Sequence, residues 1–200
     1  LMTAGGRFQR RLARTGDASP RALTYHPNGK EVWFTDGADI KAVDVHTRAV
    51  RTVVTGYPFR GLDVSADGTR LIATISGHRI LGFDLPSGRF RKFGTGCSAV
   101  FSPDATLCTH NQPMHRGMYV HRWDDWSIVG EFRAPGGMTF DNEAWSNDPR
   151  WIVTRTEQPN NQNCFVHDSQ SDRSVQVTFT GDCNRPDLFG EQWLMDEWGE

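Results

Sequence analysis

The chain has 200 residues, of which 37% are hydrophobic and 23% charged, as in an ordinary globular protein. Its 22 Lys and Arg and 24 Asp and Glu give a formal net charge of -2, which argues against a dedicated nucleic-acid-binding protein with a basic excess. No apolar run is long enough to span a bilayer. Because the chain opens on Leu1 without a secretory signal, we expect a mature product or a piece of a longer protein.

Four segments share one pattern, in which an apolar strand runs into a polar turn and a second apolar strand follows. The turns start 39, 37 and 44 residues apart, and periods near 40 are typical of propeller blades or helical solenoids. Pro, Asn, Asp and Gly supply the fixed or positive φ angles that such turns need. The four turns are 26–29 (HPNG), 65–68 (SADG), 102–105 (SPDA) and 146–149 (SNDP).

Short β-rich runs decide between these two repeat architectures, since no segment keeps the 3.6-residue apolar period of a helix. Second strands are expected at 32–35, 71–74, 107–109 and 151–154, and third strands at 40–45, 80–85, 118–123 and 164–168. Fourth strands are expected at 50–54, 90–93, 128–132 and 175–179. The chain is therefore predicted to be all-β, a β-propeller of about four four-stranded blades. The repeats span about 20–56, 57–94, 95–133 and 137–180.

The two ends of the chain fit the same register. Residues 6–12 resemble the fourth strand at 88–93, and residues 185–189 resemble the innermost strands. We therefore expect partial blades at 4–13 and 183–200, within a single propeller region over 1–200. Four blades with two partial ones close poorly as a ring, which predicts part of a larger propeller or one completed by another chain.

The repeat resembles that of TolB-type, WD-repeat-like propellers. The resemblance is carried by residues 99–104 (AVFSPD), by 43–45 (VDV), and by the aspartates that close third strands, Asp44, Asp84 and Asp168. The third repeat departs from it, with Ala105 for the turn glycine and His121-Arg122-Trp123 where the aspartate is expected. Over about residues 5–190 the resemblance implies the fold and leaves the function open, because propellers host transport, scaffolding, lectin and enzyme roles.

One equivalent position per blade lies five residues before each turn, on the loop-rich face around the channel. Arg21, Arg60, Cys97 and Asp141 occupy it in the four repeats, and Arg185 occupies it in the partial blade, five residues before Gly190. The arginine forks suit carboxylate or phosphate groups, which predicts an anionic ligand or an acidic protein segment at this face. The alternative is that these arginines pair with neighbouring acids or loop carbonyls.

The loops between second and third strands share that face and carry His78, His110, His115 and Arg155. Imidazoles can ligate a metal or move protons near neutral pH, so His110 and His115 are candidate catalytic residues together with Arg155. Their spacing matches no closed metal site, and we expect neither metal nor cofactor. A polar loop with scattered histidines is the plainer interpretation.

Two carboxylates, Asp141 and Glu143, lie close together near the channel. A carboxylate pair could bind a ligand or do acid–base work across a sugar bond, although an exposed loop explains the pair equally well.

The four cysteines include no C-x-x-C pair, which argues against a common zinc site. Cys97 and Cys108 fall on neighbouring strands and form a candidate disulfide, whereas buried thiols are the alternative. The compartment stays open, with an extracytoplasmic location, periplasmic or secreted, as the preferred expectation.

The sequence favours a non-catalytic binding or interaction module that recognises a protein segment or an anionic ligand at the channel-mouth face. It contains no glycine-rich phosphate loop, no G-x-S-x-G and no H-E-x-x-H. The expected partner is a protein or the remaining part of a larger chain, without nucleic acid or a membrane span. One alternative is a lyase or hydrolase of acidic polysaccharide that uses His110, His115, Arg60 and Arg155. Another is a propeller appended to a separate enzyme domain.

Overall fold

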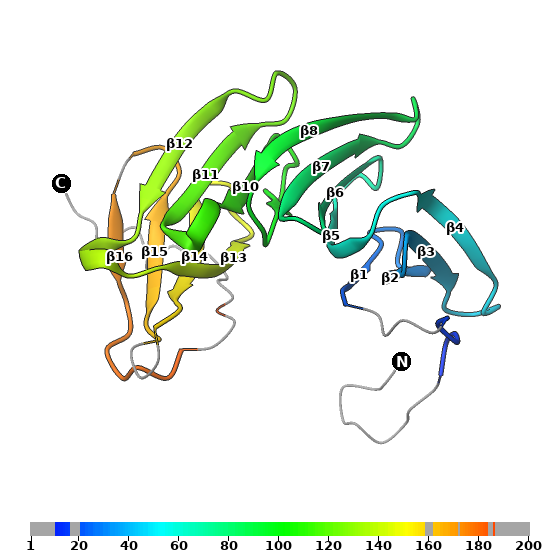
Figure 1. Ribbon diagram of the computed structural model, residues 1–200, viewed down its shortest axis with the longest axis horizontal. Helices are drawn as coiled ribbons and strands as arrows, with labels where there is room; N and C mark the ends of the chain where they lie inside the picture. Colours follow the sequence, from blue (N-terminus) through cyan, green and yellow to red (C-terminus); the bar gives the residue numbers. More distant parts are fainter. Residues whose placement is uncertain (1–10, 17–20, 159–161, 172, 184–185, 187–200) are drawn as a thin grey trace. The chain divides into compact units, whose positions relative to one another are not determined.

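The computed structural model (Figure 1) describes residues 11–16, 21–158, 162–171, 173–183 and 186. These residues form four antiparallel sheets of four strands, which confirms the predicted β-propeller of about four blades. The chain divides into two compact units, Leu1–Gly94 and Thr95–Glu200, and each holds two blades. The predicted partial blade at 183–200 lies almost wholly outside the described residues, as does that at 4–13, of which residues 11–13 are described and form no strand. The single region over 1–200 therefore stays a prediction.

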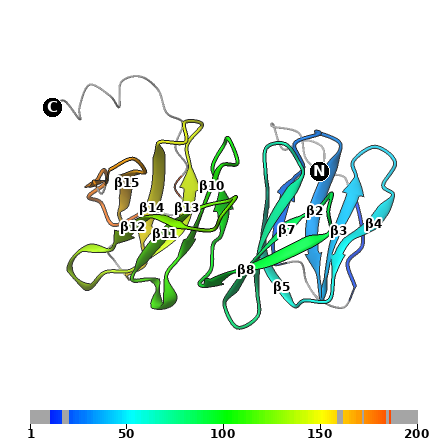
Figure 2. The ribbon, with the colours of Figure 1, turned by 90° about the horizontal axis from the view of Figure 1, so that it is seen from above.

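In each blade of unit 1 the strands pair in chain order, and Figure 2 shows β2, β3 and β4 side by side in the first blade. The first blade consists of β1 (Leu23–Tyr25), β2 (Glu31–Asp36), β3 (Asp39–Asp44) and β4 (Val50–Thr55). The second consists of β5 (Phe59–Val64), β6 (Arg70–Ile75), β7 (Arg79–Asp84) and β8 (Arg89–Thr95). Strand β5 packs against β1 and β2, and this contact buries Trp33, Phe59 and Leu71 in one apolar core.

Unit 2 repeats this arrangement. Its first blade consists of β9 (Val100–Phe101), β10 (Leu107–Asn111), β11 (Gly117–Arg122) and β12 (Ile128–Arg133). Its second consists of β13 (Phe140–Trp145), β14 (Trp151–Thr156), β15 (Cys164–Asp168) and β16 (Ser174–Gln176). Short 3-10 turns lie at η1 (Pro113–His115) and η2 (Pro135–Gly137). Strand β13 packs against β9 and β10. Among the described residues, no helix has the length and apolar character needed to cross a membrane.

The last outer strand is shorter than the sequence predicts. We expected a strand over 175–179, but β16 ends at Gln176. The Thr178 hydroxyl, rather than a backbone carbonyl, accepts the Cys164 N–H at 2.8 Å, so the regular ladder stops there.

The repeated turns have the backbone geometry that their residues predict. The N–H groups of Gly29, Gly68 and Ala105 each donate to the carbonyl three residues earlier, at 3.0, 2.8 and 2.9 Å. All three residues have positive φ, at 68°, 73° and 57°. The third repeat therefore keeps the same turn although Ala105 replaces the glycine, and this alanine adopts a backbone conformation that favours glycine.

The second blade of unit 1 rests on the first through the Gly68 turn. The His26 ring stacks on Trp33 with centroids 4.8 Å apart, and its Nε2 lies 3.4 Å from the Gly68 carbonyl oxygen. A Cβ on Gly68 would come within 2.7 Å of this ring, whereas a Cβ on Gly29 would meet nothing within 4 Å.

We therefore expect Gly68→Ala to destabilise unit 1 more than Gly29→Ala does. Both variants incur the left-handed backbone cost of about 1–2 kcal/mol. Gly68→Ala must also displace a stacked ring, which adds about 1 kcal/mol or more, as in other overpacked sites. Urea unfolding of the two variants measures the difference, and equal losses would contradict the expectation.

Candidate functional site

The predicted arginine positions fall into three different settings. Arg21 precedes β1, and its backbone N–H donates to Thr35 Oγ1 at 2.9 Å while its side chain is exposed. Arg60 lies on β5, is also exposed, and donates from Nε to Ser76 Oγ at 3.1 Å. Arg185 lies outside the described residues. The binding of an anionic ligand by these arginines therefore stays a prediction, and Arg21 and Arg60 are the two of them that the structure describes.

Two of the predicted histidines, His78 and His110, lie apart from the third, His115. His78 is exposed in the turn between β6 and β7, with φ 56°. His110 is only 2% exposed in β10, and its Nε2 lies 3.1 Å from His121 Nε2. Burial lowers the pKa of His110 to about 4. This imidazole is thus part of the interior of unit 2 rather than of its surface.

Four of the remaining predicted residues, Cys97, His115, Asp141 and Arg155, converge at one end of the two sheets of unit 2, together with Asn111 and Glu157. We call this group the blade-end cluster, and it is made of Cys97, Asn111, His115, Asp141, Arg155 and Glu157. Cys97 precedes β9, Asn111 ends β10 and His115 lies in η1. Asp141 lies near the start of β13, Arg155 lies near the end of β14, and Glu157 directly follows that strand. Strand pairing brings these positions together, because Asp141 lies opposite Arg155 and the Asn111 N–H donates to the Cys97 carbonyl at 3.0 Å.

Local backbone features bring the cluster close to the sheet. Gly96 passes so near the Asn111 carbonyl and the His110 ring that a Cβ would collide with both. His115 and Met114 before it have φ values of 56° and 62°, in the region that non-glycine residues seldom adopt. Such strain persists where the surroundings hold the residue in place.

His115 lies at the centre of the cluster. Its Nε2 is 3.1 Å from the Cys97 Sγ, and its Nδ1 is 2.7 Å from Glu157 Oε2 and 4.0 Å from Asp141 Oδ1. A thiol, an imidazole and a carboxylate in this order resemble a nucleophile, a base and an orienting acid. Burial, however, raises the pKa of the Cys97 thiol, which disfavours the reactive thiolate near neutral pH.

Asp141 is held from two sides. Its Oδ1 accepts from Asn111 Nδ2 at 3.2 Å and from Ser98 Oγ at 3.3 Å. Its Oδ2 faces Arg155 Nη2 at 3.4 Å. When the Asn142 amide is turned so that its oxygen faces Arg155, it accepts from Nε at 2.7 Å. The guanidinium is therefore already engaged and is 13% exposed.

Glu143 lies two residues further along β13, and the structure buries it rather than leaving it in an exposed loop. The residue is 5% exposed, and neither carboxylate oxygen has a hydrogen-bond partner among the described residues. Burial raises its pKa well above the usual value.

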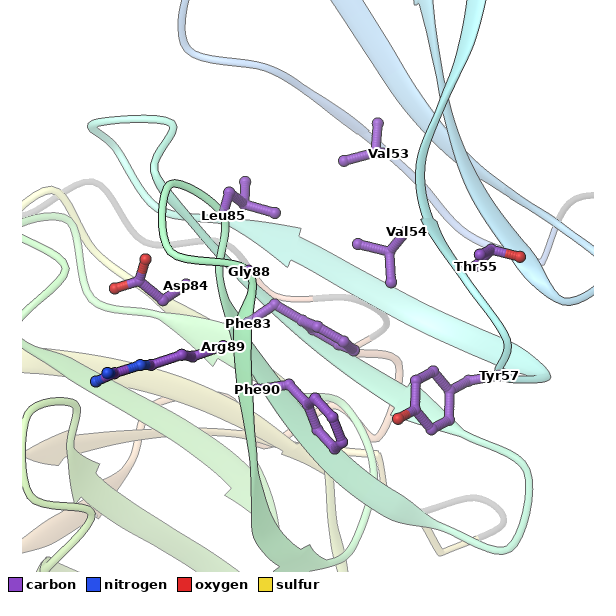
Figure 3. Close-up of a pocket in the computed structure, with 10 residues that line it drawn as sticks. All are labelled: Val53, Val54, Thr55, Tyr57, Phe83, Asp84, Leu85, Gly88, Arg89 and Phe90. Atoms are coloured by element: carbon purple, nitrogen blue, oxygen red, sulfur yellow. The ribbon is translucent and has the colours of Figure 1, made fainter.

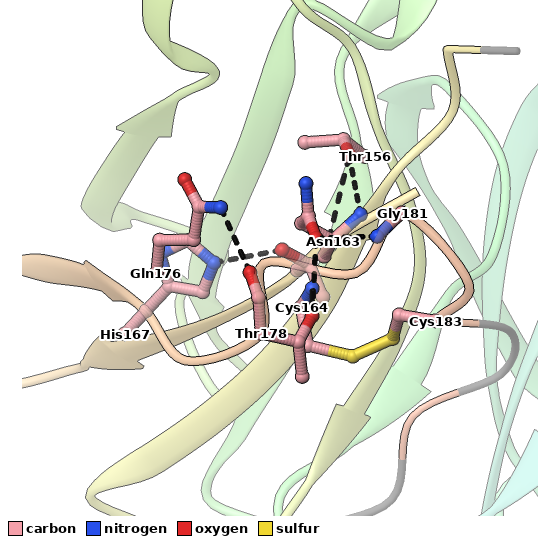
Figure 4. The surroundings of a disulfide bond; sticks show 9 residues. Thr156, Asn163, Cys164, His167, Gln176, Thr178, Gly181 and Cys183 are labelled. Carbon is pink, nitrogen blue, oxygen red and sulfur yellow. Dashed lines mark hydrogen bonds between the residues drawn. A yellow bond between two sulfur atoms is a disulfide. The ribbon is translucent and has the colours of Figure 1, made fainter. Parts of the chain in front are cut away.

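The disulfide differs from the sequence-based expectation. Cys164 and Cys183 are bonded, with Cα atoms 5.8 Å apart (Figure 4), while Cys97 and Cys108 are free. The Cys97–Cys108 pairing is wrong because Cys97 lies beside Asn111, three residues along β10 from Cys108. At about 3.3 Å per residue this is beyond disulfide reach.

A groove of about 300 Å³ lies in unit 1 between β4 of its first blade and β7 and β8 of its second. Tyr57, Phe83 and Phe90 form its floor, while Asp84 and Arg89 point away from these rings (Figure 3). Asp84 and Arg89 are the only charged residues of this lining, and they point away from the rings, so the blade-end cluster is the better candidate site.

The sequence pointed to Cys97, His115, Asp141 and Arg155 but not to Asn111 or Glu157 as their partners. Both residues lie in the loop segments that the repeat places on this face. The sequence did not indicate their contacts with the other cluster residues, because these contacts join different blades. His115 and Glu157, for example, are 42 residues apart in the chain.

No protein-family model and no curated protein matches the sequence. Solved structures share the fold at low identity. TolB from Acinetobacter baumannii has 19% identity and a TM-score of 0.66, over 88% of this chain and 47% of that one. The Cps50 (Swd1) β-propeller domain from Myceliophteria thermophila has 12% identity and a TM-score of 0.65, over 81% and 60%. An oligogalacturonate lyase in complex with manganese has 16% identity and a TM-score of 0.61, over 78% and 52%.

The chain spans about half the length of the solved structures it matches. At these identities the likeness concerns the fold alone. That fold is a β-propeller of the TolB-type, WD-repeat-like kind.

Proposed function

We propose that the chain is a non-catalytic binding module whose blade-end cluster recognises a protein segment. The observation that supports this proposal is the gathering of six polar or charged side chains at the loop end of two blades, where propellers present their variable residues. The partner is another protein or the remaining part of a larger chain, because both present segments of the same chemistry.

The charges of the cluster favour a segment with a basic side chain. Arg155 is engaged by Asp141, while the Glu157 side chain is 42% exposed and faces solvent beside His115. An incoming Lys or Arg would add a charge-assisted hydrogen bond to this carboxylate. The anionic ligand predicted from Arg21 and Arg60 is a separate proposal for unit 1.

Selection of a randomised peptide library on the immobilised chain tests this function. We expect basic peptides to be enriched, and Glu157→Gln to weaken the best peptide by about 10-fold or more, as for loss of a charged hydrogen bond. Asp124→Asn, in the turn at the other end of the β11–β12 hairpin, is the matched control and should bind as the parent does. Failure to enrich any peptide, or equal binding by Glu157→Gln, would refute the proposal.

A further inference from the structure

We propose that the blade-end cluster also binds a divalent transition metal, with Cys97, His115 and Asp141 as its ligands. One ligand atom from each residue lies within 4.8 Å of the other two, and each residue is partly buried. A thiolate, an imidazole and a carboxylate together suit Zn²⁺ better than Ca²⁺ or Mg²⁺, which prefer oxygen ligands. This inference goes beyond the binding of a protein segment and does not depend on it.

The surroundings of His115 match those of a metal-bound histidine. Its Nδ1 donates to Glu157 Oε2 at 2.7 Å, which leaves Nε2 directed at the Cys97 Sγ, 3.1 Å away. Metal-ligating histidines typically hold their second nitrogen on a carboxylate in this way. Two ligand atoms on one tetrahedral Zn²⁺ lie about 3.5 Å apart for bonds of about 2.3 and 2.0 Å, so the pair needs to open only slightly.

Asp141 is oriented in a similar manner. Arg155 and Asn111 approach different oxygens of its carboxylate, and Oδ1 is the oxygen that faces His115. Arg155 thus acts as a positioning residue on Oδ2, and a metal ion on Oδ1 would displace one of the two hydrogen bonds that Asn111 and Ser98 donate to that oxygen. Binding of the metal would release the Cys97 thiol proton to the solvent, so that the thiolate becomes the ligand.

Two buried side chains beside the three ligands carry acceptor oxygens with no hydrogen-bond partner among the described residues, which independently points to a cation. Asn111 is fully buried, yet its Oδ1 accepts no hydrogen bond from the part of the chain that the structure describes. Both oxygens of Glu143 are in the same condition. Buried acceptors without donors are costly and rare, and an ion is one of the accepted explanations for them. The Asn111 amide lies among the ligands, because its Nδ2 donates to Cys97 Sγ at 3.5 Å and to Asp141 Oδ1 at 3.2 Å. Glu143 follows Asp141 by two residues on β13.

Titration of the chelator-treated full chain with Co²⁺, followed by Zn²⁺, tests this inference. We expect one Co²⁺ per chain with a thiolate-to-cobalt charge-transfer band in the near ultraviolet, which Zn²⁺ then removes by displacement. Cys97→Ser should abolish the band, and His115→Gln and Asp141→Asn should weaken binding by more than 100-fold. Glu157→Gln should weaken it only by the 10- to 100-fold that is typical of outer partners.

Cys108→Ser removes the other free thiol and should keep the band unchanged. Circular dichroism of each variant before titration shows whether the fold is retained, and Cys97→Ser, at a partly exposed position, is the decisive variant. Absence of the band in the folded parent chain, or its persistence in Cys97→Ser, would overturn the inference. Since no peptide is present in this titration, its failure is distinct from failure of the peptide selection.

Discussion

Asp168→Ala should destabilise unit 2 by about 3 kcal/mol in urea unfolding. The Asp168 side chain is 3% exposed and accepts from Arg150 Nε at 3.1 Å and Nη2 at 2.8 Å. It also accepts from the Gln170 N–H and the Ser171 hydroxyl. Although burial alone would raise it, these bonds hold the pKa of Asp168 below its usual value. Alanine would leave a partly buried guanidinium without its carboxylate, which is the costly way to break an ion pair.

Asp84→Ala provides the matched control for this prediction. Asp84 closes the third strand of its blade just as Asp168 does and accepts the Ser87 N–H, but it is exposed. We expect Asp84→Ala to lower the free energy of unfolding much less than Asp168→Ala does. A similar effect of the two variants would show that the hydrogen bonds within the turn, and not the ion pair with Arg150, stabilise unit 2.

Acidification from pH 7 to pH 5 should destabilise the native state through His167, by about 2 kcal/mol from this residue alone. His167 is fully buried, with Nε2 2.8 Å from Thr154 Oγ1 and Nδ1 2.7 Å from Ser174 Oγ. Burial lowers its pKa from 6.5 to about 3. The unfolded chain therefore binds one more proton between these two values, and stability is lost as the pH falls below about 6.5. Unfolding free energies at pH 7, 6 and 5 give the slope.

His167→Phe isolates this contribution. The ring already packs against Phe132 and Phe140, so phenylalanine can fill the space while removing the titrating group. Glu143 acts in the opposite direction, because its raised pKa favours a protonated native state above pH 4.5, and the total profile is a sum. The pH profile of His167→Phe should therefore lack the contribution of one proton that the parent shows between pH 7 and pH 5. An unchanged slope in the variant would assign the acid sensitivity to other groups.

The fold was predictable because each blade marks its own boundaries. The turns at Gly29 and Gly68 need a residue with positive φ, which strands and helices do not need, so the spacing of these turns revealed the repeat. Two predictions were wrong because contacts between strands are not visible in the sequence. The Thr178 hydroxyl accepts the Cys164 N–H and ends β16 early, and Cys97 lies beside Asn111 rather than Cys108.

The candidate site was only partly predictable. Counting positions within the repeat placed Cys97 and Asp141 on one face, because equivalent positions share an end of every blade. The sequence did not indicate that Glu143 would be buried without a hydrogen-bond partner among the described residues, since the burial of a carboxylate on β13 depends on how neighbouring sheets pack.

The strand order within the blades has a consequence for folding kinetics. Every strand pairs with its neighbour along the chain, as in β5-β6-β7-β8, so each sheet forms by closing only short loops. Loop-closure entropy rises with loop length, and topologies rich in local contacts fold faster than those with distant pairings. A blade can thus form as soon as its own segment is available, which leaves the packing of one blade on the next, such as β13 on β9 and β10, as the later and slower event.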